Sequence, residues 1–326
     1  MHGPAIGPVY AIYYPVLAAF GVPCNLVAIV ILLRGRCGIS RCITHYLVAM
    51  AATDLLVIIT AVILNRIGGI YFRDSFFSTT LGCSLSTVLV YASRDSSVWL
   101  TVAFTFDRFI AICCLELKTR YCTEKTAAAV IACVCTLSCL KNIPFYYRYQ
   151  PLYIVNNVAW FCDIKSSYYT SPAWQVDDWL DRIFTPCLPF FLILLLNVLT
   201  VRHILAANRG RMRLQDNRIG ENHRDPELEN RRKSIILLFA ISISFLLLWA
   251  TYVIHFVYVR IIGDFYFTGF NFNDQRFILQ ESTNMLQLFS SCTNTFIYAV
   301  TQNRFRGELK NAVKYPLIKV ANCFKQ

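Results

Sequence analysis

Charged residues are scarce in this 326-residue chain: they make up 15% of it, whereas 56% of its residues are hydrophobic. A soluble protein usually has about 25% charged residues, because its surface faces water. The sequence also lacks the residue-by-residue alternation of a membrane β-barrel, and an open sheet would leave backbone groups unpaired in lipid. These absences argue against a soluble domain and favour several membrane helices, each of about 20 apolar residues.

Seven apolar runs are long enough to be such helices. Several contain polar residues, as is typical of helices that pack against one another. The runs cover residues 10–33, 44–66, 80–113, 126–147, 183–206, 234–262 and 277–301. We therefore expect an all-α membrane protein, a seven-transmembrane helix bundle over residues 10–301. The first run is too long for the apolar region of a cleavable signal peptide, so we expect none.

Basic and acidic residues are distributed unevenly around the runs, within a net charge of +12. If residue 1 is outside, the outer segments carry 8 basic and 8 acidic residues, and the inner segments carry 22 basic and 9 acidic ones. Because basic loops stay in the cytoplasm, residues 1–9 form a short extracellular N-terminus. The protein is then a multi-pass protein of the plasma membrane, and its basic residues report topology rather than binding to nucleic acid.

Most of the 14 cysteines are expected to be free thiols, because eleven fall in the runs or on the cytoplasmic side. Cys83 and Cys162 lie at the predicted outer surface, and Cys187 lies just inside the fifth run. We expect a disulfide between Cys83 and Cys162. The cysteines of the fourth run have no nearby histidine, so we interpret them as small packing residues rather than metal ligands. The sequence also has no Asn-x-Ser/Thr sequon, so N-glycosylation is not expected.

Three charged residues fall deep inside the runs, where each costs about 3 kcal/mol unless it has a partner, a watery cavity or a function. Asp54 interrupts the second run and is either an ion or proton site or a protonated, hydrogen-bonded carboxyl. Arg94 shares one face of the third run with Ser97 and Arg108 on a helical period. Asp95 is turned about 100° away from that face, and we expect it only to have a packing partner.

Several motifs occur in a fixed order along the chain. They are Asn25, Asp54, Cys83, Asp107-Arg108-Phe109, Trp249, Asn294 with Tyr298, and Asn303-Arg304-Phe305-Arg306. Together they resemble the rhodopsin-like (class A) G-protein-coupled receptors over nearly the whole chain. Within that class, residues 97–102 and 248–250 and the spacing from Pro189 to Asn197 resemble the probable G-protein coupled receptor 139 group of orphan receptors.

The resemblance implies a receptor that activates a heterotrimeric G protein when an extracellular ligand binds. It implies a cytoplasmic switch made of Asp107, Arg108, Phe109, Asn294 and Tyr298. It also implies that residues 302–326 form a short amphipathic helix and a cytoplasmic tail. In that tail Cys323 is either a palmitoylation site or an idle thiol.

A polar cluster is implied at the middle of the membrane, made of Asp54, Ser97, Ser291 and Asn294. Such a cluster could hold a sodium ion at Asp54, and we expect no other cofactor and no metal. Trp249 would lie just beneath the ligand.

Helical faces in the outer half of the runs predict the rest of the ligand pocket. Its members are Val90, Tyr91, Arg94, Tyr252, His255, Asn284 and Gln287. Val90 stands where amine receptors of this class have an aspartate, which disfavours a monoamine. The planar guanidinium of Arg94 suits a carboxylate or carbonyl, so we expect a small acidic or zwitterionic molecule or a peptide terminus. Alternatively, Glu281 or a neighbouring carbonyl satisfies Arg94 internally.

The chain departs from the class pattern at three helix positions. Thr251 and Thr295 replace the usual prolines of the sixth and seventh helices. A threonine hydroxyl can bond back to a carbonyl and bend its helix, so weaker hinges are expected there. Arg231 replaces the acidic residue that often faces Arg108. It should repel Arg108 and raise basal signalling.

The inner segment 207–233 is strongly basic, which suits anionic membrane lipids or an acidic protein surface. It contains no serine or threonine, and the tail has none after Thr301. Phosphorylation-driven arrestin recruitment should therefore be weak, unless Thr119, Thr123 or Thr126 serve instead. A transporter or channel and a scaffold that uses no G protein remain alternatives, although internal repeats are absent. No nucleophile–base pair predicts an enzyme.

Overall fold

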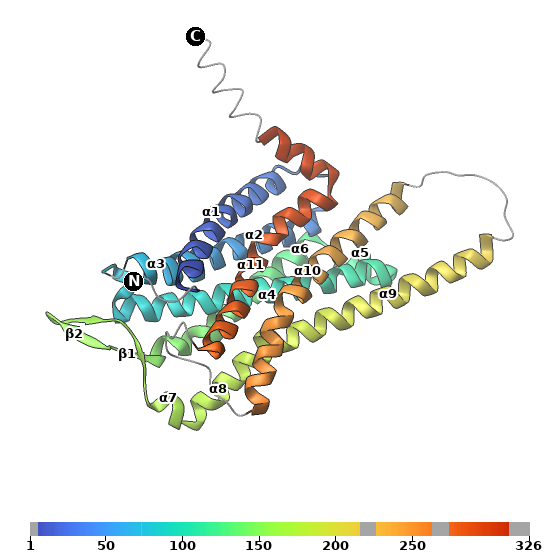
Figure 1. Cartoon of the computed structure of the whole chain (residues 1–326). Coiled ribbons are helices and arrows are strands. Elements are labelled where there is room, and N and C mark those ends of the chain that lie inside the picture. Colours follow the sequence, from blue (N-terminus) through green and yellow to red (C-terminus); the bar gives the residue numbers. More distant parts are fainter. Residues whose placement is uncertain (1–5, 73, 216–225, 263–273, 313–326) are drawn as a thin grey trace, which may run out of the picture.

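The long helix α4 (Thr80–Cys113) runs through the middle of the helix bundle and packs against α2, α6, α9 and α10 (Figure 1). The computed structural model describes residues 6–72, 74–215, 226–262 and 274–312. The other helices of the bundle are α1 (Ile6–Leu33), α2 (Arg41–Val57) with η1 (Ile58–Ile67) and α3 (Gly68–Tyr71), α6 (Glu124–Asn142) with η3 (Ile143–Arg148), α8 (Pro172–Arg182) with η4 (Ile183–Cys187) and α9 (Leu188–Gln215), α10 (Pro226–Ile262) and α11 (Gln275–Thr301). The expected all-α seven-helix bundle is confirmed.

Six of the described helical stretches are long and apolar enough to cross a membrane. The seventh, α11, is 27 residues long, which suffices for a crossing, but it is richer in polar residues. Large apolar side chains cover the outside of the bundle, among them Ile12, Leu247 and Val300, which are 65–75% exposed. Such a surface is stable against lipid tails and unstable in water. The protein is therefore a multi-pass membrane protein.

One end of the bundle carries α3, α7 (Ser167–Thr170), α8 and a β-hairpin, and the first described residues lie near it (Figure 1). The hairpin joins β2 (Tyr153–Val155) to β3 (Val158–Trp160) in antiparallel register, with Val155 opposite Val158. Its turn residues Asn156 and Asn157 have φ of 51° and 61°, which is the conformation that two-residue hairpin turns require and asparagine tolerates. Two short strands, β1 (Tyr149–Gln150) and β4 (Asp163–Ile164), pair beside it. The opposite end carries α5 (Leu115–Tyr121), the C-terminal end of α9 and the N-terminal end of α10.

A helical run at 303–312 follows α11 after a break at Gln302. Phe305 is fully buried and stacks edge-on against Tyr298, with ring centroids 5.9 Å apart, whereas Arg304 and Arg306 are exposed. One apolar and one charged face are what an amphipathic helix requires. Cys323 lies outside the described residues.

The structure does not show the expected bonds from the Thr251 and Thr295 hydroxyls back to carbonyls of their own helices. The Thr251 hydroxyl is buried and has no hydrogen-bond partner among the described residues. The Thr295 hydroxyl donates to the Cys24 carbonyl of α1, 3.2 Å away, rather than to its own helix. Beside it, the Asn25 amide donates to the carbonyls of Gly21 and Ser291. The contacts of Asn25 and Thr295 therefore join α1 to α11.

Candidate functional sites

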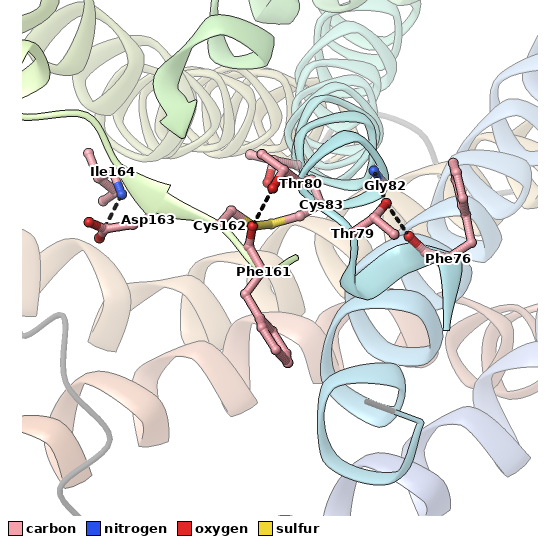
Figure 2. The surroundings of a disulfide bond; sticks show 10 residues. Phe76, Thr79, Thr80, Gly82, Cys83, Phe161, Cys162, Asp163 and Ile164 are labelled. Atoms are coloured by element: carbon pink, nitrogen blue, oxygen red, sulfur yellow. Dashed lines mark hydrogen bonds between the residues drawn. A yellow bond between two sulfur atoms is a disulfide. The ribbon is translucent and has the colours of Figure 1, made fainter. Parts of the chain in front are cut away.

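The predicted disulfide between Cys83 and Cys162 fixes the N-terminal end of α4 (Figure 2), with Cα atoms 6.4 Å apart. Thr79 caps the helix by accepting a hydrogen bond from the Gly82 amide. A side chain at Gly82 would collide with the Phe76 carbonyl, so the turn before the helix requires glycine. The Thr80 hydroxyl donates to the Phe161 carbonyl at 2.7 Å, which adds a polar contact beside the covalent bond.

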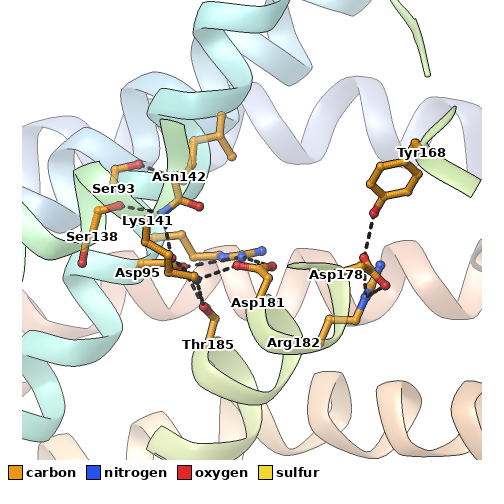
Figure 3. A network of polar contacts seen from close by, with 12 residues as sticks. Ser93, Asp95, Ser138, Lys141, Asn142, Tyr168, Asp178, Asp181, Arg182 and Thr185 are labelled. Atoms are coloured by element: carbon orange, nitrogen blue, oxygen red, sulfur yellow. Dashed lines mark hydrogen bonds and ion pairs between the residues drawn. The ribbon is translucent and has the colours of Figure 1, made fainter. Parts of the chain in front are cut away.

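A network of four charged side chains joins α4 to α6 and α8 within the bundle (Figure 3). The Lys141 ammonium lies 2.6 Å from the Asp95 carboxylate and 2.6 Å from the Asp181 carboxylate. The remaining hydrogen-bonding capacity of Asp95 is filled by the Asn142 amide and the Thr185 hydroxyl, each at 2.9 Å. Because the charges sum to zero and Asp95 has a donor for each oxygen, the network can exist away from water.

This network corrects three expectations from the sequence. Asp95 does turn away from the face of Arg94, but it is the centre of an ion network rather than a packing residue. The eight basic residues counted in the outer segments include Lys141, whereas it lies in the last turn of α6, within the fourth apolar run, and reaches Asp95. Arg94 has Asp181 and not Glu281 as its described acidic partner from another helix.

Arg94 is the least satisfied member of the network. Its Nη2 lies 3.4 Å from Asp181 and 3.6 Å from Asp95, longer than the contacts of Lys141. Its Nε is buried and has no hydrogen-bond partner among the residues that the structure describes. The guanidinium lies over the Tyr91 ring, 4.5 Å from its centroid, and Tyr91 in turn stacks on Phe145. Arg94 thus keeps a free donor beside an aromatic surface.

A second ion pair lies between η1 and α11. Arg66 is 3.0 Å from the Glu281 carboxylate, which also accepts hydrogen bonds from Tyr14 and from Asn284. Glu281 is therefore occupied by Arg66, which explains why it does not reach Arg94. The predicted pocket residue Asn284 belongs to this pair.

The other predicted pocket residues lie on α4, α10 and α11. Tyr252 packs edge-on against Trp249, with ring centroids 5.9 Å apart, and lies within electrostatic reach of Arg94. His255 and Gln287 are buried. Val90 packs against the apolar cluster of α1, η1 and α11. Their contact with a ligand stays a prediction.

A polar cluster lies at the middle of the bundle, around Asp54. Its carboxylate accepts hydrogen bonds from the Ser97 hydroxyl at 2.6 Å and from the Asn294 amide at 2.7 Å. A cavity of about 20 Å³ adjoins these groups. Its lining consists of Asp54, Ser97, Thr101, Ile241, Phe245, Trp249, Ser290, Thr293 and Asn294. A cavity of this size holds one water or one small ion.

Ser291, which the sequence placed in this cluster, lies elsewhere. Its carbonyl accepts the hydrogen bond from Asn25, and the lining from α11 comes instead from Ser290, Thr293 and Asn294. Ser290 also accepts a hydrogen bond from the Trp249 indole at 3.2 Å. The cluster is thereby linked to the residue that was predicted to lie beneath the ligand.

Near the C-terminal end of α4, Asp107 and Arg108 form a buried pair. The Arg108 Nε donates to the Asp107 carboxylate at 2.9 Å, and its Nη2 contacts the same oxygen. Cys42 donates to the other Asp107 oxygen, and Cys122 to its carbonyl. Burial, reinforced by Asp107, raises the pKa of the Cys122 thiol to about 11, so it stays a neutral donor.

Arg108 also reaches the foot of α10, where its Nη1 donates to the Ser234 hydroxyl at 3.3 Å. Ser234 is not among the predicted switch residues, because the resemblance pointed instead to Arg231, one turn earlier, as the residue that faces Arg108. The side chain of Arg231 lies outside the described residues. Phe109 is half-buried, and Tyr298 is fully buried against Phe305.

Comparisons with known proteins agree with this arrangement. The family model of the seven-transmembrane receptors of the rhodopsin family matches residues 24–298. The chain is 23% identical over 303 residues to C-C chemokine receptor type 1 of Macaca fascicularis, covering 91% of this chain and 77% of that protein. It is 20% identical over 308 residues to galanin receptor 2a of Danio rerio, covering 93% and 77%. It is 26% identical over 312 residues to probable G-protein coupled receptor 142 of Mus musculus, covering 94% and 73%. The finer resemblance to the receptor 139 group stays a prediction.

Proposed function

Because this chain belongs to the rhodopsin family of seven-transmembrane receptors, we propose that it lies in the plasma membrane and activates heterotrimeric G proteins when an extracellular ligand binds. The end that carries the hairpin and the disulfide is the outer end. The uneven distribution of basic residues supports this orientation. So does the Cys83–Cys162 bond, since disulfides persist in oxidising surroundings.

The ligand carries a carboxylate that binds Arg94. It is either a small acidic or zwitterionic molecule or a terminus of a peptide, and a peptide accords with the names of the galanin and chemokine receptors among the relatives. The observation that carries this proposal is the free Nε of Arg94 beside two long ion-pair contacts. Lys141 contacts both aspartates at 2.6 Å, so each keeps a cationic partner when Arg94 turns to an incoming anion.

Binding acts by favouring one arrangement of the helices over another, and only a difference in affinity between the two can shift their populations. Below Arg94, the rings of Tyr252, Trp249 and Phe245 are in contact in sequence along α10. Trp249 also touches the cavity beside Asp54. A ligand that moves Tyr252 therefore changes the packing of Trp249 and the polar cluster, from which the change reaches the inner ends of α10 and α11.

A sodium ion fits the chemistry of that cluster. The Asp54 carboxylate and the hydroxyls of Ser97 and Thr101 offer oxygen atoms, which hard cations prefer, around a cavity of about 20 Å³. Such an ion would neutralise Asp54 and favour the arrangement in which the cavity is intact. Sodium should then oppose activation.

A G-protein activation screen against amino acids, small acids and peptides tests the proposed function. Active compounds should lose activity when their carboxylate is converted to an amide. Arg94→Gln should abolish the response at unchanged surface expression, whereas Arg66→Gln, the same change in the other outer ion pair, should leave most of it. An unchanged response in the Arg94 variant would refute the role of Arg94, and a chain that activates no G protein with any compound would refute the receptor function.

A further inference from the structure

The contact between Arg108 and the foot of α10 is weak for a pair that should hold a receptor closed. The Ser234 hydroxyl is neutral and lies 3.3 Å from the guanidinium. Among the described residues it is the hydrogen-bond partner that α10 offers to Arg108. A negative charge at this position would convert this bond to a neutral hydroxyl into an ion pair between two charged groups, which can also be bidentate and is therefore stronger.

The sequence around Ser234 is that of a substrate for a basophilic protein kinase. Arg231-Arg232-Lys233 precedes the serine and an apolar residue, Ile235, follows it. Kinases of this class select serines by acidic pockets that pair with arginines two and three positions earlier, through guanidinium–carboxylate contacts. Arg232 is exposed. Ser234 is also the first hydroxyl after the basic segment 207–233, which has none.

We propose that Ser234 is a phosphorylation site, and that its phosphate locks the foot of α10 to α4 through Arg108. This inference rests on the proposed receptor function. In the reaction, the Ser234 oxygen attacks the terminal phosphorus of ATP, an oxygen–phosphorus bond forms, and the bond from that phosphorus to ADP breaks. The hydroxyl proton passes to a base of the kinase.

The charges around Ser234 favour the lock. A phosphate adds a charge of about −1.5 to −2 and three acceptor oxygens at neutral pH. Arg108 lies at hydrogen-bond distance on α4, and three basic residues precede the serine on α10. The phosphate thus supplies the acid that the sequence lacks at Arg231. The Asp107 carboxylate repels the phosphate. However, both described charge contacts of Asp107 are to Arg108, which lies between the carboxylate and the phosphate.

The half-buried position of Ser234 determines which arrangement of the receptor is phosphorylated. In the closed arrangement the hydroxyl faces Arg108 and is hidden from a kinase, which needs an accessible segment. When α10 moves away from α4, the serine is released. The kinase therefore acts on the active receptor, and the phosphate returns it to the closed arrangement.

The purified full chain in lipid nanodiscs, treated with a basophilic kinase and ATP, provides the test. Mass spectrometry should find phosphate on Ser234, and Arg232→Gln should reduce its incorporation. The treated protein should catalyse nucleotide exchange on its G protein about fivefold more slowly, and hydrogen exchange in 226–240 should slow. Ser234→Ala should not respond to the kinase, and Ser234→Glu should be less active than the neutral, similarly shaped Ser234→Gln.

Absence of phosphate on Ser234, while the kinase modifies a control peptide, would overturn the site. Phosphate with unchanged or faster exchange on the G protein would overturn the lock. If the untreated chain activates no G protein, the receptor function fails instead, and phosphate incorporation and hydrogen exchange still decide whether Ser234 is modified and closes α10.

Discussion

Near its outer end, α4 places Asp95 among charged and polar partners from α6 and the α8–η4 stretch, whereas near its inner end Arg108 is held mainly by its own neighbour Asp107. Every described partner of Asp95 except Arg94 comes from another helix. Arg108 has one neutral contact with another helix, at Ser234, among the described residues. The charges around Asp95 therefore join helices through ion pairs, whereas Asp107 and Arg108 reach other helices through the neutral groups of Cys42 and Ser234 among the described residues.

This difference indicates where the bundle can move. Separating α4 from α6 or α8 would break ion pairs in surroundings of low polarity, which is costly. Separating α10 from Arg108 would break one hydrogen bond from the guanidinium to a neutral hydroxyl, worth about 1.5–3 kcal/mol, and no ion pair among the described residues. We infer that the outer ends of α4, α6 and α8 form a fixed frame and that the inner end of α10 is the moving part.

Asp95→Asn should have the largest effect on stability, because it leaves two cations, Lys141 and Arg94, against one carboxylate within the frame. We expect a loss of about 3 kcal/mol, as for other broken buried ion pairs, measured as thermal unfolding in nanodiscs. Adding Lys141→Met should recover more than about 1 kcal/mol, since the two residues are in direct contact. Additive losses in the double variant would contradict the network.

Replacing both Cys83 and Cys162 by serine should rank next. The bond closes a loop of 79 residues, and its removal should cost about 2–4 kcal/mol. Cys187→Ser is the matched control, because this cysteine is free and only partly buried. Equal losses in the two proteins would show that the bond does not support the frame.

Glu281→Gln makes the same chemical change as Asp95→Asn in the second ion pair. Among the described residues Glu281 pairs with one cation, Arg66, whereas Asp95 contacts two, Lys141 and Arg94. The loss should therefore be about 1 kcal/mol. If this variant unfolds as readily as Asp95→Asn, the two outer ion pairs contribute alike and the frame is not confined to α4, α6 and α8.

The sequence predicts the contacts in these regions to different extents, and the reason is physical. Cys83 and Cys162 were predictable because each lies at the outer surface, where two thiols can meet. Asp95, Lys141 and Asp181 lie on three different helices. The helical period of each sequence segment does not predict how these helices are rotated relative to one another. Ser234 and Thr295 were missed or misassigned likewise, because their partners Arg108 and Cys24 lie on other helices.

Arg231→Glu should give a smaller, functional effect at the inner end. An acid there would attract Arg108 across the gap that Ser234 spans, and basal nucleotide exchange should fall about threefold. Lys233→Glu, two residues later, is the control for the charge change alone. Unchanged basal exchange in the Arg231 variant would show that this position does not act on Arg108.

Ligand-dependent arrestin recruitment should be the smallest response. Residues 207–233 and the tail after Thr301 have no serine or threonine to phosphorylate, and a single phosphate at Ser234 lies against Arg108 rather than on a free tail. Recruitment measured in cells should stay near background. Strong recruitment that disappears when Thr119, Thr123 and Thr126 are changed to alanine would assign it to the segment after α4.

Hydrogen exchange of the protein with and without its bound, nucleotide-free G protein tests the fixed frame and the moving foot most directly. Our account predicts faster exchange in residues 226–240 of α10 and unchanged exchange around Asp95, Lys141 and Asp181. Faster exchange around Asp95 with an unchanged α10 foot would contradict it.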